Sequence, residues 1–156
     1  MLITQEVTHF YHRAKEYCVW AEGLTQSKIV DVYKALQLVV NLYQAILFVP
    51  DFEPIDYEMV GDLRKSREIY YWFTGFPFQY YQEFFHPVAD KPDESVTGDI
   101  SDDLMDIYID TKEGILFYEQ GNIVNAAFHW RFSFGAHWGR HATGTICAMH
   151  DYLTNK

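Results

Sequence analysis

The sequence predicts an all-α protein in which residues 1–156 form a single domain, a bundle of about five helices. Apolar residues recur at helical spacing along most of the chain. Strand-like alternation and Asn-Gly hairpin signals are lacking, as are internal repeats and linkers. With 49% hydrophobic residues in 156, the chain is long and apolar enough to bury one self-sufficient core.

The first two helices are expected over residues 2–21 and 26–48. Each segment repeats apolar side chains every three or four positions, which is typical of a helix with one buried stripe. Gly23 is a natural stop for the first helix. Thr25 or Ser27 is the expected cap of the second helix.

A third helix is expected over about 57–73. Pro50 and Pro54 end the preceding helix and form a rigid connection. Asp56 can cap the third helix. Its solvent-facing side would carry four charged residues: Arg64, Lys65, Arg67 and Glu68.

Residues 74–99 form an irregular, aromatic-rich segment between the third and fourth helices, punctuated by proline and glycine. Within it, residues 76–85 carry many rings and suggest a short helix. These rings either plug one end of the bundle, which we favour, or form an exposed contact surface for a partner.

The last two helices are expected over residues 100–120 and 123–153. Asp99 or Ser101 can open the first of them, and Gly121 closes it. Three glycines in the second predict either a bend or a close helix contact: Gly135, Gly139 and Gly144.

Acidic residues gather on one side of the helix 100–120. They are Asp102, Asp103, Asp106, Asp110 and Glu113. Such a row is usually a solvated face. However, the Asp-x3-Asp spacing stacks like charges, so basic side chains from another helix or a divalent cation can be expected to neutralise it.

His137 and His141 fall at the edge and in the middle of the apolar face of the last helix. A buried imidazole needs a hydrogen-bond partner, and Asp103 and Asp110 are the nearest expected carboxylates. The pair therefore has three interpretations: hydrogen-bonded structural histidines, which we favour, ligands of zinc, manganese or iron, or contacts to an organic ligand.

The candidate polar cluster gathers the residues that these projections bring together: Asp103, Asp106, Asp110, Arg131, His137 and His141. Among them Asp103, Asp106, Asp110, His137 and His141 are the candidate metal ligands. Arg131 and Arg140 supply cations that can pair with the acidic row or with an anionic ligand. His129 projects away from His141 and is not expected to be a third histidine ligand.

The formal net charge of −10 argues against nucleic acid and anionic membranes as partners. Two separated cysteines fit neither a disulfide framework nor a zinc spacing, so a reduced, cytoplasmic protein is expected. No phosphate-binding glycine loop or nucleophile elbow occurs, which excludes the common nucleotide-binding and serine-hydrolase folds.

Two long motifs resemble those of a bacterial all-helical family known only as a domain of unknown function. They run from Ser101 to Gly114 (SDDLMDIYIDTKEG) and from Trp130 to Ala142 (WRFSFGAHWGRHA). The resemblance covers roughly residues 80–150. It implies an all-helical fold in which the two polar motifs belong together, and no activity or cofactor.

Two functions follow as hypotheses. The first is a non-enzymatic interaction or regulatory module that binds a protein partner or forms a homodimer. The alternative is a metal-dependent hydrolase or small-ligand-binding protein that uses the aspartate row and the His-x3-His pair.

Overall fold

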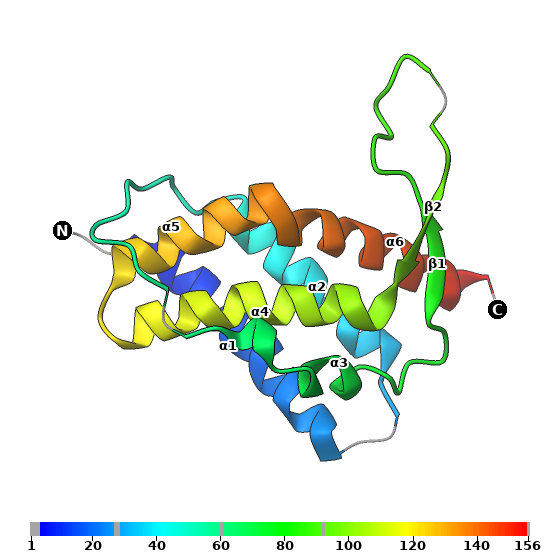
Figure 1. Ribbon diagram of the computed structural model, residues 1–156, viewed down its shortest axis with the longest axis horizontal. Helices are drawn as coiled ribbons and strands as arrows, with labels where there is room; N and C mark the ends of the chain where they lie inside the picture. Colours follow the sequence, from blue (N-terminus) through cyan, green and yellow to red (C-terminus); the bar gives the residue numbers. More distant parts are fainter. Residues whose placement is uncertain (1–3, 27–28, 60, 92, 156) are drawn as a thin grey trace.

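The computed structural model describes residues 4–26, 29–59, 61–91 and 93–155. It confirms the predicted all-helical class: a bundle of helices forms the body, and the described residues contain one small two-stranded sheet (Figure 1). No described helix combines the length and the apolar character that crossing a membrane requires.

The first two long helices are α1 (Gln5–Gly23) and α2 (Val32–Ile46). The second begins later than expected, since Asp31 is its cap and accepts a hydrogen bond from the Lys34 amide. Thr25 instead lies in the short 3-10 helix η1 (Leu24–Gln26), and Ser27 lies outside the described residues.

The predicted third helix is wrong over most of its length. Among the described residues of this segment, only the 3-10 turn η2 (Leu63–Lys65) and the short helix α3 (Glu68–Trp72) are helical. A tertiary contact explains the difference: the Asn125 side chain accepts from the amide of Ile55 at 2.8 Å and donates to its carbonyl at 2.6 Å. Asp56 follows with a φ of 46°, and no helix starts there.

The prediction that the chain has no strand is also wrong. β1 (Tyr80–Glu83) and β2 (Val96–Asp99) pair antiparallel, and their connecting loop projects beyond the helical body (Figure 1). A loop of this length carries no short-turn signature. Gly98 permits the pairing, because a Cβ there would lie 2.5 Å from the Tyr81 ring.

The aromatic segment 76–85 divides between the two expected roles. Phe76 and Phe78 pack against the core, as a plug would. Phe84 and Phe85 lie on the hairpin and are exposed.

α4 (Ile100–Glu119) is the central helix, and it begins and ends close to the predicted residues. Asp99 caps it by accepting from the amides of Ser101 and Asp102. It packs against α1 on one side and against α5 and α6 on another, so both its apolar and its acidic sides are largely buried.

The predicted last helix is interrupted by a π-helical turn. α5 (Ile123–Ser133), η3 (Phe134–Trp138) and α6 (Gly139–Thr154) follow one another antiparallel to α4 (Figure 1). The expected bend thus falls where Gly135 and Gly139 stand, and π-helical turns often accompany functional sites. This turn carries His137 and leads into His141.

Candidate functional site

The acidic side of α4 is a buried surface. Asp103, Asp106, Asp110 and Glu113 are all buried, so the solvated-face interpretation holds only for Asp102. The consecutive helical segments α5, η3 and α6 cover this side together with η2, which precedes α3. Burying like charges at successive turns requires compensation by other groups.

Each histidine of the pair is held by a carboxylate on α4. His137 Nδ1 lies 2.6 Å from Asp110 Oδ2, and His141 Nδ1 lies 2.7 Å from Asp103 Oδ1. These are the two carboxylates that the helical projection placed nearest. An ionised carboxylate can only accept, so both imidazoles carry their proton on Nδ1 and, when neutral, present Nε2 as a lone pair.

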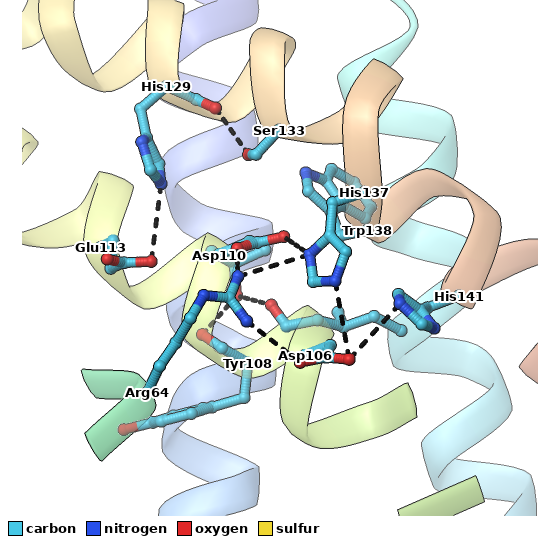
Figure 2. Close-up of polar contacts among 12 residues, drawn as sticks. Arg64, Asp106, Tyr108, Asp110, Glu113, His129, Ser133, His137, Trp138 and His141 are labelled. Atoms are coloured by element: carbon cyan, nitrogen blue, oxygen red, sulfur yellow. Dashed lines mark hydrogen bonds and ion pairs between the residues drawn. The ribbon is translucent and has the colours of Figure 1, made fainter. Parts of the chain in front are cut away.

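Both Nε2 atoms point toward one oxygen of Asp106, as Figure 2 shows. The distances to Asp106 Oδ2 are 3.6 Å from His137 and 3.4 Å from His141. A ligand atom from each of the three residues lies within 4.8 Å of the others. We call this group the His-pair cluster.

Arg64 supplies the guanidinium of the site. Its Nη1 lies 3.2 Å from Asp106 Oδ1 and its Nη2 lies 2.6 Å from Asp110 Oδ1 (Figure 2). The sequence placed Arg64 on the solvent-facing side of a helix that does not form, so its role was missed. The acidic row predicted that basic side chains or a divalent cation would neutralise it, but it did not indicate Arg64 as one of the basic residues.

Tyr81 connects the hairpin to the site. Its hydroxyl donates to Asp103 Oδ2. Burial and the Asp103 carboxylate raise the pKa of Tyr81, so the phenol keeps its proton. Gly144 on α6 makes room, because a Cβ there would lie 2.6 Å from the Tyr81 hydroxyl oxygen.

A second group of ligand atoms lies one turn further along α4. Asp110, Glu113 and His129 bring one atom each within 4.8 Å, and all three residues are buried. His129 Nδ1 lies 2.6 Å from the Tyr57 hydroxyl, and its Nε2 lies 3.9 Å from Glu113 Oε1. We call this group the His129 cluster. The sequence analysis included Glu113 only in the acidic row and set His129 aside.

The electrostatics of the two clusters differ. Burial, reinforced by the charge of Asp110, raises the pKa of Glu113 to about 7. Burial also lowers the pKa of His129. Burial would lower the pKa of His141 as well, but the hydrogen bond and charge of Asp103 outweigh it and raise this pKa.

A cavity of about 530 Å³ opens beside the site. Its walls include Arg64, Asp110, Glu113, His129 and His137. A small molecule or ion from solvent can therefore reach polar groups of both clusters through one opening.

Arg131 does not join the cluster. It pairs with exposed Asp51 at 3.4 Å and donates to the Ile46 carbonyl. Arg140 donates to the Phe85 carbonyl and lies over the Phe85 ring.

Comparison with known proteins places the chain in a family. The family model for "Domain of unknown function (DUF5063)" matches residues 77–155, just over half of the chain, and includes every histidine and carboxylate of the two clusters. The comparison of this chain with curated proteins found no match. The crystal structure of protein BF1032 from Bacteroides fragilis is similar in fold, with a TM-score of 0.77 and 22% identity, covering 95% of this chain and 92% of that one. The chain belongs to the DUF5063 family.

Proposed function

We propose that the protein binds a divalent transition-metal ion at Asp106, His137 and His141 and acts as a metal-dependent hydrolase. The observation that carries this proposal is the convergence of two imidazole Nε2 atoms on one carboxylate oxygen. Three lone-pair donors facing one another repel unless a cation or a proton lies between them.

The spacing of these atoms suits a metal ion. Bonds of about 2.0–2.2 Å in a tetrahedral site put neighbouring ligand atoms about 3.3–3.6 Å apart. The Nε2–Oδ2 distances of 3.4 and 3.6 Å fall in this range. Asp106 also divides its oxygens, since Oδ1 accepts from Arg64 while Oδ2 faces the histidines.

The surrounding hydrogen bonds favour the same interpretation. Metal-binding histidines commonly donate their other N–H to a carboxylate, which orients the ring and makes the free nitrogen a better ligand. Asp110 and Asp103 occupy this position for His137 and His141. Of the three buried aspartates, Asp106 and Asp110 contact the Arg64 guanidinium and Asp103 does not, so a dication would balance the remaining negative charge.

Two imidazoles and one carboxylate suit zinc, manganese or iron. Three protein ligands leave a coordination position for water, whose pKa a bound dication lowers toward neutrality. Substrate would approach from the cavity of about 530 Å³, where Arg64 offers a donor to an anionic group. Hydrolysis of a small polar substrate is the activity that follows.

The test is metal content after purification without chelators. Native mass spectrometry and elemental analysis should find a divalent ion that His141→Ala loses, together with metal-dependent hydrolysis of small esters or phosphate esters. His150→Ala is the matched control, because His150 is an exposed histidine of the same helix. A metal-free wild-type protein that also fails to bind added zinc would show that the histidines are only structural.

The interaction hypothesis is supported by a different region. Phe84, Phe85 and Val88 are exposed on the projecting hairpin (Figure 1). Exposed apolar side chains gathered in this way favour a protein-binding role. Light scattering would detect a homodimer, and replacing Phe84 and Val88 with serine should abolish it; a monomer at all concentrations would contradict self-association.

A further inference from the structure

We propose that Asp110, Glu113 and His129 form a second divalent-cation site, so that α4 carries a two-ion centre. The two-ion description rests on the proposed function of the His-pair cluster. The evidence for the second site comes from its own residues, and the second site can be tested independently of the first.

The first argument is an unsatisfied buried nitrogen, His129 Nε2, that faces a carboxyl group. The side chains of His129 and Glu113 are only 8% and 6% exposed. Within the described part of the chain, His129 Nε2 has no hydrogen-bond partner. Its 3.9 Å separation from Glu113 Oε1 is too long for a direct hydrogen bond. A bridging cation would satisfy both groups.

The second argument is the tautomer of His129. The Tyr57 hydroxyl donates its proton to Met59 Sδ at 3.1 Å. In the tautomer that carries the ring proton on Nδ1, its oxygen accepts from His129 Nδ1, which lies 2.6 Å away. This leaves Nε2 of the neutral ring as a lone pair aimed at Glu113, the arrangement that a metal ligand requires.

The third argument is position and access. Glu113 is one turn from Asp110 on the same helix, and His129 on α5 faces Glu113 (Figure 2), with ligand atoms of all three residues within 4.8 Å of one another. Asp110 also contacts His137, so the two ions would lie on either side of one carboxylate. The ligand residues line the cavity of about 530 Å³, which gives an ion a path from solvent.

The ligand set of the second site differs from that of the first. One imidazole and two carboxylates form a more oxygen-rich site, which favours manganese or magnesium over the ions that prefer nitrogen ligands.

The experiment counts bound ions in the full chain with Mn²⁺ and Zn²⁺ as probes. Electron paramagnetic resonance and native mass spectrometry should give two ions for the wild type. Glu113→Gln should retain one ion and lose at least about 100-fold in affinity for the other. His141→Ala should also retain one ion, and the double variant should retain none.

Each result separates the two proposals. One ion that is lost in His141→Ala and unaffected by Glu113→Gln would overturn the second site and leave the first. One ion lost only in Glu113→Gln would support the second site and overturn the first. No bound ion would overturn both, with a proton shared near Glu113 as the remaining explanation.

Two variants serve as controls. Glu119→Gln changes an exposed glutamate of the same helix and should leave both ions in place. Circular dichroism and thermal melting establish that each variant is folded. Glu113→Gln preserves the size of the side chain, so the variant should fold and its ion count is decisive.

Discussion

The two clusters on α4 both bury histidines and carboxyl groups, but the hydrogen-bond partners and neighbouring charges of these groups differ. In the His-pair cluster, each Nδ1 contacts a carboxylate and Arg64 compensates the negative charge. In the His129 cluster, Nδ1 contacts a neutral phenol, and Glu113 accepts no hydrogen bond from any described residue. The pKa of His141 is raised accordingly, whereas that of His129 is lowered.

This difference shows that burial alone does not fix the charge of a buried group. A histidine beside a carboxylate remains a strong base despite desolvation, and one beside a phenol does not. The first cluster has the Arg64 guanidinium beside its carboxylates. The second retains an uncompensated carboxyl group, and it should respond more strongly to protons and to added cations.

The largest effect is expected from Gly114→Ala, which should disrupt the helix contact that both clusters share. A Cβ at Gly114 would lie 2.0 Å from Trp130 Nε1, the atom that donates to the Thr111 carbonyl. We expect the free energy of unfolding in urea to fall by about 3 kcal/mol, and metal binding to weaken at both clusters. Gly135→Ala is the control, since no atom lies within 4 Å of its Cβ; its change should stay within about 1 kcal/mol. Equal stabilities of the two variants would contradict the close packing.

Glu113→Gln and Asp106→Asn should change stability in opposite directions when metal is chelated. At pH 8 the ordinary glutamate value of 4.5 and the folded pKa of about 7 imply that ionised Glu113 destabilises the fold by up to about 3 kcal/mol, which glutamine would recover. Asp106→Asn removes a charged acceptor of Arg64 and should cost about 1–3 kcal/mol. Urea unfolding measures both, and losses of similar size would eliminate the distinction between the clusters.

The folding stability of the metal-free protein should depend on pH, because the pKa values of Glu113 and His141 are shifted in the folded state. Glu113 with a raised pKa binds its proton more tightly when folded, so stability falls as the pH rises from about 4.5 through 7. His141, also raised, adds stability that is complete below pH 6.5 and is lost as the pH rises through its folded pKa. Saturating zinc should reverse the slope, because metal replaces these protons. Thermal melts from pH 5 to 8, with Glu113→Gln for comparison, would show a slope that the variant reduces; an unchanged slope would count against the pKa assignment.

The smallest effect is expected from Tyr81→Phe. The variant removes the hydroxyl that donates to Asp103 and should cost about 1 kcal/mol. Zinc affinity should fall less than about tenfold, since Tyr81 acts on the ion only through Asp103 and His141. Tyr80→Phe, on the exposed side of the same strand, should change neither quantity. A loss of zinc binding in Tyr81→Phe would give the hairpin a larger role than the structure indicates.

Local sequence signals predicted much of this molecule. The Asp99 cap and the Gly121 stop predicted α4, because both act through their immediate neighbours. Helical projection also identified Asp103 and Asp110 as the carboxylates nearest to the two histidines, without assigning one to each, because the acidic residues and the histidines lie on consecutive helical segments.

The rest depends on contacts between distant segments. The Asn125 side chain hydrogen-bonds the backbone of Ile55, and the chain that follows forms a loop where a helix was predicted. This loop places Arg64 beside Asp106. The hairpin brings Tyr81 to Asp103 through a long loop. The spacing of residues along one helix does not indicate which distant segments contact it. For this reason the predicted polar cluster lacked Arg64 and Tyr81 and wrongly included Arg131.

The central claim is that the two Nε2 atoms and Asp106 hold a metal ion. X-ray absorption spectroscopy on protein loaded with one equivalent of zinc tests it most directly, because imidazole ligands give a distinct outer-shell scattering pattern. We predict two histidine nitrogens and at least one oxygen at about 2.0–2.2 Å, and the loss of this two-histidine signal in His141→Ala. A zinc spectrum without histidine scattering, or one unchanged in His141→Ala, would contradict the claim.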